Sequence, residues 1–190
     1  MKKVLLTSVI ALMTVSASAQ VYVGGEVGAW RNWEKGANKS SITLLPEIGY
    51  NLDENLSIGT TIGWQYNYYG KKINPHNGKT LKVNSLRVAP YARYTFLKLD
   101  NVNLFLEGGF GFATSKVKGL DAMNSWEVGV KPGVFVNLTD KLSFVAHCGF
   151  FGYRTSDDAI PGVNVSPFGE NGFGFSAKST DLSFGLYWNF

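Results

Sequence analysis

The chain ends with the sequence Leu182-Ser183-Phe184-Gly185-Leu186-Tyr187-Trp188-Asn189-Phe190. Large apolar side chains fill every second position, and a period of two places them on one face of a β-strand. A bare apolar strand at the end of a soluble protein promotes edge-to-edge association. In a closed barrel that spans a bilayer, the last strand pairs with the first and turns such a face to lipid. The stretch therefore predicts a transmembrane β-strand.

The same stretch resembles the C-terminal targeting signal of bacterial outer-membrane barrels, in which a final Phe follows apolar residues at alternate positions. The resemblance assigns five residues to that signal: Leu182, Phe184, Leu186, Trp188 and Phe190. It also implies that barrel-assembly machinery is a partner during insertion.

The N-terminus has the three parts of a secretory signal peptide. Two lysines precede an apolar run, Val4–Val15, and Ala17-Ser18-Ala19 forms a small-residue cleavage site. The run is shorter than the ~20 residues that a spanning helix needs, which disfavours the alternative of an uncleaved anchor. We expect residues 1–19 to be removed on export through the periplasm, and residues 20–190 to form one domain.

The composition narrows the classes of fold and partner. The chain has 22 Gly, 13 Phe, 9 Tyr and 5 Trp, and few long segments carry a helical period. The single cysteine, Cys148, allows no intramolecular disulfide, although an exported chain meets an oxidising compartment. Lysine and arginine do not gather on one helix, so we expect no nucleic-acid partner.

Eight stretches of alternating hydrophobicity follow the predicted signal peptide. Most reach the roughly 9–11 residues that cross a bilayer at a tilt, and short links alternate with longer ones, as periplasmic turns and outer loops do. The pattern predicts an all-β fold, an eight-stranded antiparallel up-and-down transmembrane β-barrel. The expected strands are Val21–Trp33, Ser41–Tyr50, Leu56–Tyr68, Leu81–Leu97, Asn103–Thr114, Ser125–Asn137, Leu142–Tyr153 and Thr180–Phe190.

An internal repeat supports this prediction. Pro46–Ile58 aligns without gaps on Pro132–Phe144, and a slightly longer version is Pro90–Leu104. Each copy reads as a strand, a polar turn and a second strand. Because proline removes a ladder donor, we expect β-bulges in the descending strands that carry the three prolines. The hairpins resemble the small outer membrane protein beta-barrel domain family, akin to OmpA/OmpX-type barrels, which implies the outer membrane of a Gram-negative cell.

Alternation gives each strand an outward apolar face with no charged residue in its central part. A lysine or arginine at that depth would cost ~2–4 kcal/mol. The same counting places Phe150 outward and Phe151 inward. The core of a soluble sandwich is the alternative interpretation, and the length of the strands disfavours it.

The inward face holds glycines, bulky aromatic residues and eight ionisable residues. The ionisable set is Glu26, Glu47, Arg87, Arg93, Glu107, Glu127, Lys131 and His147. Unpaired charges in a narrow barrel would be costly, so we expect a network among these groups and trapped water. Two interpretations stay open: a structural plug, which we favour, and a gate or proton relay.

We expect no catalytic site, metal site or cofactor. A lipid A deacylase or palmitoyl transferase of the outer membrane would need a nucleophile, a base and an orienting group. His147 is predicted in mid-strand and His76 in a loop, and neither has an obvious serine and acid beside it in the sequence.

Cations outnumber anions in the predicted loops and their strand ends, where Arg154 is counted. The expected basic collar consists of Lys71, Lys72, Lys79, Lys116 and Lys118. Such a collar would attract the phosphates of lipopolysaccharide, and a plain solvated surface is the alternative. The last loop, Arg154–Ser179, has apolar residues that suggest packing over the barrel mouth or a partner surface.

We therefore predict a monomeric, structural barrel of the cell envelope in the outer membrane. Its lumen would be polar and filled by side chains, and its loops would be available for lipopolysaccharide or partner contact. The alternatives are a narrow, porin-like, low-conductance pore gated by the Glu/Arg/Lys network, and a soluble exported lipid carrier of lipocalin shape.

Overall fold

The computed structural model describes residues 20–31, 39–70, 80–117, 120–157, 165–177 and 182–190. These residues form β1 (Val21–Arg31), β2 (Lys39–Asn51), β3 (Leu56–Tyr69), β4 (Leu81–Leu99), β5 (Val102–Val117), β6 (Met123–Asn137), β7 (Leu142–Cys148), β8 (Phe150–Ser156), β9 (Gly172–Ser176) and β10 (Leu182–Asn189). No helix within these ranges is long and apolar enough to cross a membrane.

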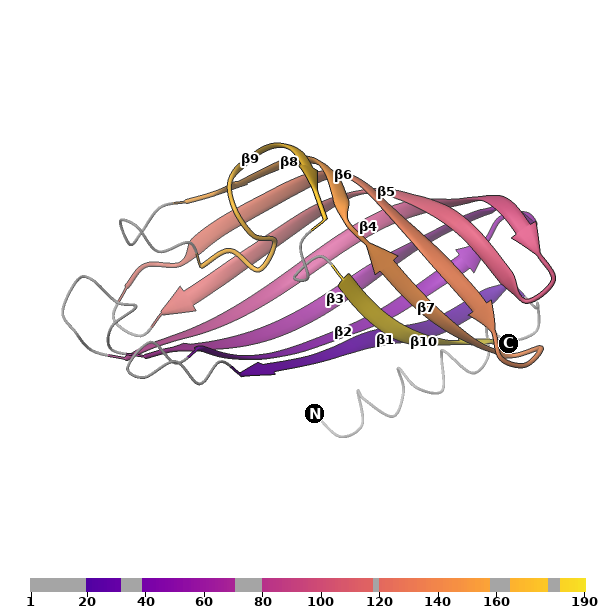
Figure 1. Ribbon diagram of the computed structural model, residues 1–190. Coiled ribbons are helices and arrows are strands. Elements are labelled where there is room, and N and C mark those ends of the chain that lie inside the picture. The colour runs from indigo at the N-terminus through magenta and orange to yellow at the C-terminus, as the bar shows by residue number, and fades with distance from the viewer. Residues whose placement is uncertain (1–19, 32–38, 71–79, 118–119, 158–164, 178–181) are drawn as a thin grey trace, which may run out of the picture.

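The strands form a closed antiparallel ring (Figure 1). From β1 to β7 each strand pairs with the next, and β10 joins β7 to β1. Further along the barrel, β8 takes the place of β7 beside β6, and β9 pairs with β8. Because β7 with β8, and β9 with β10, each act as one wall strand, the structure confirms the predicted eight-stranded antiparallel barrel.

The first and last strands meet at the end of the barrel that carries the tight turns, which we name the turn end. The backbone N–H of Asn189 donates to the Lys141 carbonyl over 2.8 Å. The N–H of Phe190 donates to the Val21 carbonyl over 3.2 Å. The opposite end is named the loop end. The C-terminal strand therefore closes the ring, as its alternating pattern predicts.

The wall has an apolar outer face. Large side chains that are at least 36% exposed include Val27, Ile42, Leu44, Ile48, Ile58, Ile62, Trp64, Leu86, Val88, Tyr94, Phe96, Leu106, Phe110, Trp126, Val128, Phe184, Leu186 and Trp188. All of them belong to the predicted outward faces. Since the inner faces of the same strands pack against one another, the outer face is left for hydrocarbon.

The predicted alternation fails between β7 and β8. The ladder with β6 shifts there by one residue. Gly149 lies at the shift with a φ of 91°, a conformation that favours glycine. Beyond the shift the two faces of the strand exchange. Phe150 is therefore buried and Phe151 is exposed, the opposite of the prediction.

The sequence pattern predicts a loop at Gly172–Ser176, whereas the structure has a short strand there, β9. Phe173 and Phe175 of this strand are exposed on the outer wall, although they were expected in the loop. Val165 and Phe168, from the same predicted loop, are buried inside the loop end. Val165 and Phe168 thus lie in the barrel mouth, and Gly172–Ser176 extends the wall.

The aligned repeat copies make the same turn. Asp53 Oδ1 accepts hydrogen bonds from the backbone N–H groups two and three residues later, at 2.7 and 2.8 Å. Thr139, the aligned residue in the other copy, accepts the equivalent two bonds through Oγ1 at 3.3 and 3.0 Å. Each side chain satisfies two backbone donors that the tight turn leaves without a ladder partner.

None of the three prolines lies at a bulge of its own strand, so the prediction that bulges in the descending strands accommodate them is wrong. Opposite Pro132, the neighbouring strand carries the shift at Gly149. At Pro46 and Pro90 the register stays constant, and the ladder omits two consecutive pairs on one side. The prediction is wrong because proline removes one donor on one side, which needs no extra residue. The shift in β4 lies beyond Pro90, between Thr95 and Leu97.

Candidate functional site

The predicted ionisable residues come from inward positions on six wall strands, and all except Arg87 take part in two groups of ion pairs. Arg87 Nε is buried without a hydrogen-bond partner among the described residues. They are Glu26 on β1, Glu47 on β2, Arg87 and Arg93 on β4, Glu107 on β5, Glu127 and Lys131 on β6, and His147 on β7. One group lies toward the turn end and the other toward the loop end. Each pairing joins residues that lie far apart in the sequence or on different strands, except Glu127 with Lys131.

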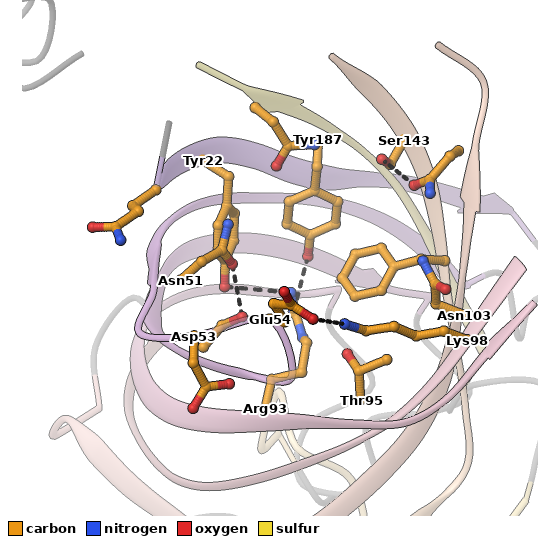
Figure 2. A pocket seen from close by; sticks show the side chains of 15 residues that line it. Tyr22, Asn51, Asp53, Glu54, Arg93, Thr95, Lys98, Asn103, Ser143 and Tyr187 are labelled. Carbon is orange, nitrogen blue, oxygen red and sulfur yellow. Dashed lines mark hydrogen bonds and ion pairs between the residues drawn. The ribbon is translucent and has the colours of Figure 1, made fainter. Parts of the chain in front are cut away.

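Arg93 is the centre of the group near the turn end. Its guanidinium lies 3.0 Å from Glu47 and 2.7 Å from Glu107, and only 1% of its side chain is exposed. Aromatic ring centroids lie 4.8 to 5.7 Å from its guanidinium carbon, in Tyr22, Tyr91, Phe105, Phe135 and Tyr187. Figure 2 shows Tyr22 and Tyr187 directed toward Arg93. The buried cation is thus compensated by carboxylates and by π-systems.

Hydroxyl groups complete the surroundings of Glu47. Tyr187 donates to its carboxylate over 2.6 Å, and Tyr91 also donates to it. Gly59 makes room for Tyr91, because a Cβ at that position would collide with the phenol. The sequence predicts both tyrosines as bulky inward residues but not as partners of Glu47. The sequence signal for this contact is an inward tyrosine, whose hydroxyl needs a hydrogen-bond partner, at a similar depth in the barrel to an inward carboxylate.

His147 joins two carboxylates. Its Nδ1 lies 2.9 Å from Glu26 and its Nε2 lies 3.2 Å from Glu107. The β7–β10 register brings Ser183 opposite His147, and the Ser183 hydroxyl lies 3.5 Å from Nδ1. A serine, a histidine and acids therefore lie together, a proximity that the sequence pattern does not predict. Both imidazole nitrogens face carboxylate oxygens, so neither is free to accept a proton from Ser183.

Glu127 is the centre of the group near the loop end. Its carboxylate lies 2.6 Å from Lys131 Nζ and 3.2 Å from Arg154 Nε. Arg154 is predicted as a cation of the outer loop, but it lies on β8 and faces inward. The shift at Gly149 exchanges the faces of this strand and turns the arginine toward Glu127. The carboxylates of the lumen are thus matched by an equal number of arginines and lysines.

Phe168 covers the charged groups on the side of the loop end. Its ring centroid lies 5.9 Å from the Arg87 guanidinium carbon. Gly111 leaves room for this ring, since a Cβ there would come within 2.8 Å of it. Val165 is buried in an apolar cluster to which several strands contribute. Apolar side chains therefore separate the inner charges from the mouth at the loop end.

The structure places only part of the other predicted site residues. Lys116 of the basic collar is exposed on β5, near the loop end. Lys71, Lys72, Lys79 and Lys118 lie outside the described residues, as do His76 and the predicted signal peptide. Within the predicted assembly signal, Phe184, Leu186 and Trp188 are exposed on the outer wall. The backbone of Leu182 begins β10, and Phe190 directly follows that strand.

Comparisons with known proteins agree with this architecture. The family model described as "Outer membrane protein beta-barrel domain" matches residues 4–190. No curated protein matches the chain significantly. The chain is similar to the crystal structure of Neisserial surface protein A (NspA), with 18% sequence identity, a TM-score of 0.52, and coverage of 91% of this chain and 98% of that one. At this identity the likeness shows the fold alone. The chain belongs to the outer membrane protein beta-barrel domain family.

Proposed function

We propose that the protein is a structural barrel of the outer membrane whose polar lumen is closed by its own side chains. The main support is Arg93, which is buried, bound to two carboxylates and surrounded by five aromatic rings. A solute that crossed the barrel would have to displace this paired cation. An eight-stranded barrel is only wide enough for side chains to fill, so little room remains beside it.

A narrow, low-conductance pore is the second candidate, because ionisable groups line the interior from Glu47 to Arg154. Planar-bilayer recording separates the two functions. We expect no steady channel from the wild-type barrel. Arg93→Ala should give measurable conductance, because it removes the side chain that fills the lumen between Glu47 and Glu107. Lys98→Ala, at the exposed pair with Glu54, serves as the matched control and should remain silent. Steady wild-type channels would contradict the plugged barrel and support the pore.

We further propose that the loop end contacts lipopolysaccharide through the basic collar of Lys71, Lys72, Lys79, Lys116 and Lys118. Lysines act as point charges toward phosphate, so the contact should weaken at high salt. Charge reversal of Lys71, Lys72 and Lys79 should reduce the lipopolysaccharide that copurifies with the barrel. Charge reversal of Lys141, in an exposed turn at the other end, is the control. If the triple variant copurifies with as much lipopolysaccharide as the wild type, the proposed contact through the basic collar is wrong.

We infer that the protein is not an enzyme, since His147 is engaged by carboxylates on both ring nitrogens. Mass spectrometry of lipid A should therefore show no modification, with either the wild-type protein or His147→Gln.

We also propose export with removal of residues 1–19, insertion by barrel-assembly machinery, and a monomeric state in a Gram-negative cell. N-terminal sequencing of the membrane-inserted protein should begin at Gln20, and a start at Met1 would contradict the cleavage.

A further inference from the structure

A water-accessible cup opens at the turn end, with a volume of about 470 Å³. This volume lies in the usual range for small-molecule sites, roughly 300–1,000 Å³. Figure 2 shows side chains from several strands arranged around the cup, with Arg93 and Tyr187 at its inner side. The cup is separate from the ion pairs that close the lumen, except that Arg93 belongs to both.

Every wall strand, or the residue beside it, places an amide or aliphatic hydroxyl side chain on this cup, and β1 and β10 add the phenols of Tyr22 and Tyr187. Carboxamides come from Gln20 beside β1, Asn51 on β2, Asn103 on β5, Asn137 on β6 and Asn189 on β10. Hydroxyls come from Ser57 on β3, Thr95 on β4 and Ser143 on β7. The result is a complete ring of amide and hydroxyl groups. Two members of each repeated hairpin are also fixed in place, because Ser57 donates to Asn51 at 2.8 Å and Ser143 donates to Asn137 at 2.9 Å.

The charged groups around the cup already have partners. Arg93, at the inner side, is paired with Glu47 and Glu107. At the rim, Lys98 lies 3.8 Å from Glu54. Asp53 accepts two backbone hydrogen bonds within its own turn. A ligand therefore needs no net charge, and the ring selects for a neutral molecule that both donates and accepts hydrogen bonds.

We propose that this cup binds a neutral N-acetylated amino sugar. An acetamido group presents one N–H and one C=O side by side, which matches the donor and acceptor of a carboxamide such as Asn103 or Asn189. Sugar hydroxyls donate and accept in the same way as the hydroxyls of the ring. Phe135 is half-buried in the wall of the cup, where Arg93 and Phe105 pack against its ring, so its remaining apolar edge would contact the C–H groups of a pyranose. The volume accommodates a ligand of one to two sugar rings.

The test uses the full mature protein refolded in detergent micelles and titrated with N,N′-diacetylchitobiose. Cellobiose is the matched probe, because it has the same linkage and lacks the acetamido groups. We expect saturable binding of chitobiose with shifts of the asparagine side-chain amide signals in NMR spectra, and clearly weaker binding of cellobiose. Absence of saturable chitobiose binding would overturn the proposal, and equal binding of cellobiose would overturn the assignment to amino sugars.

Variants locate the site. Asn103→Ala combined with Asn189→Ala should weaken chitobiose binding by about tenfold, the effect of losing two neutral hydrogen bonds. Asn84→Ala is the control, because Asn84 is an exposed asparagine on β4 near the loop end. If the double variant does not fold, Asn103→Asp alone keeps the shape and should still weaken binding. Unchanged affinity in the folded variant would overturn the site, while the proposal of a plugged barrel depends on conductance and would stand.

Discussion

Arg93 compensates two carboxylates that the barrel wall removes from water. Removing one member of a buried ion pair leaves its partners charged without compensation, which typically costs about 3–5 kcal/mol. Arg93→Met keeps a long side chain and removes the charge, so it should lower the free energy of unfolding by about that amount. Urea unfolding in lipid vesicles, followed by tryptophan fluorescence, measures the change.

The matched control for Arg93→Met is Lys98→Met. Lys98 lies 3.8 Å from Glu54 in a pair whose side chains are 43% and 94% exposed. Exposed pairs contribute about 0–1 kcal/mol, so this variant should unfold almost like the wild type. Equal losses in the two variants would show that the Arg93 pairs are not compensating buried charge.

Asp53 provides a titration at the residue scale, outside the membrane-spanning segments. Backbone N–H groups of Asn55 and Leu56 donate to its carboxylate and hold its pKa below the usual value of 3.8. A lowered folded-state pKa stabilises the protein above the unfolded-state pKa, and the benefit is lost as the pH falls through the folded-state value. Asp53→Asn should therefore be less stable than wild type at pH 7, and the difference should shrink under acid.

Thr139 supplies the control for this pH dependence, because it makes the same turn without an ionisable group. The difference in thermal unfolding midpoint between wild type and Thr139→Ala should stay constant over the same pH range. A constant difference for Asp53→Asn as well would contradict the role assigned to the charge of the carboxylate.

At the scale of the element, the wall strands are predictable because lipid on one side imposes a period of two over nearly the whole strand. A single missed feature explains the errors of the seventh strand. The extra residue at Gly149 reverses the faces beyond it, and this reversal accounts for Phe150, Phe151 and Arg154 together. In a barrel with many glycines, a single glycine does not indicate a shift of register. Alternation counted along the sequence therefore assigns the wrong face to every residue of this strand after Gly149.

The members of the lumen site are predictable as a set, but their pairing is not. An inward ionisable residue is identified by alternation within its own strand. Its partner depends on the register between strands that can be more than a hundred residues apart, as for His147 with Glu26. β9 was missed for a local reason, since its five residues, with glycines beside Phe173, carry a pattern too short to separate from a loop.

The register shift at Gly149 can be tested as an element. A Cβ at this position would lie 2.9 Å from the Ser176 carbonyl oxygen, and the φ of 91° disfavours any side chain. Gly149→Ala should therefore destabilise the barrel by about 1–3 kcal/mol. The loss of stability can be measured by heating samples to a series of temperatures and following the disappearance of the folded band on gels of unboiled protein.

Gly28→Ala is the control for the shift at Gly149. A Cβ at Gly28 would meet Thr43 at 3.6 Å, which is ordinary van der Waals contact, and its backbone lies outside the left-handed region. We expect a stability near that of the wild type. If Gly149→Ala melts at the same temperature as Gly28→Ala, the joint between β7 and β8 does not need its glycine.

At the scale of the whole molecule, the barrel is inverted relative to a soluble protein. Its buried ion pairs lie inside, around Arg93 and Glu127, while its large apolar residues cover the outside. This distribution is stable only if hydrocarbon surrounds the wall, because water would be in contact with an apolar surface much larger than soluble monomers expose. The solvent, and not an internal core, therefore determines which face of each strand is apolar.

This dependence on hydrocarbon gives the last prediction. Ile62 lies in the middle of β3, opposite Val88 of β4, and is 57% exposed on the outer face. Ile62→Lys should cost about 2–4 kcal/mol in lipid vesicles, as expected for a lysine at the bilayer midplane. Leu52→Lys is the matched control, because Leu52 is 47% exposed in a turn, where the same charge remains in water. Urea unfolding in vesicles measures both variants, and an Ile62→Lys barrel as stable as the Leu52→Lys barrel would mean that hydrocarbon does not cover this face.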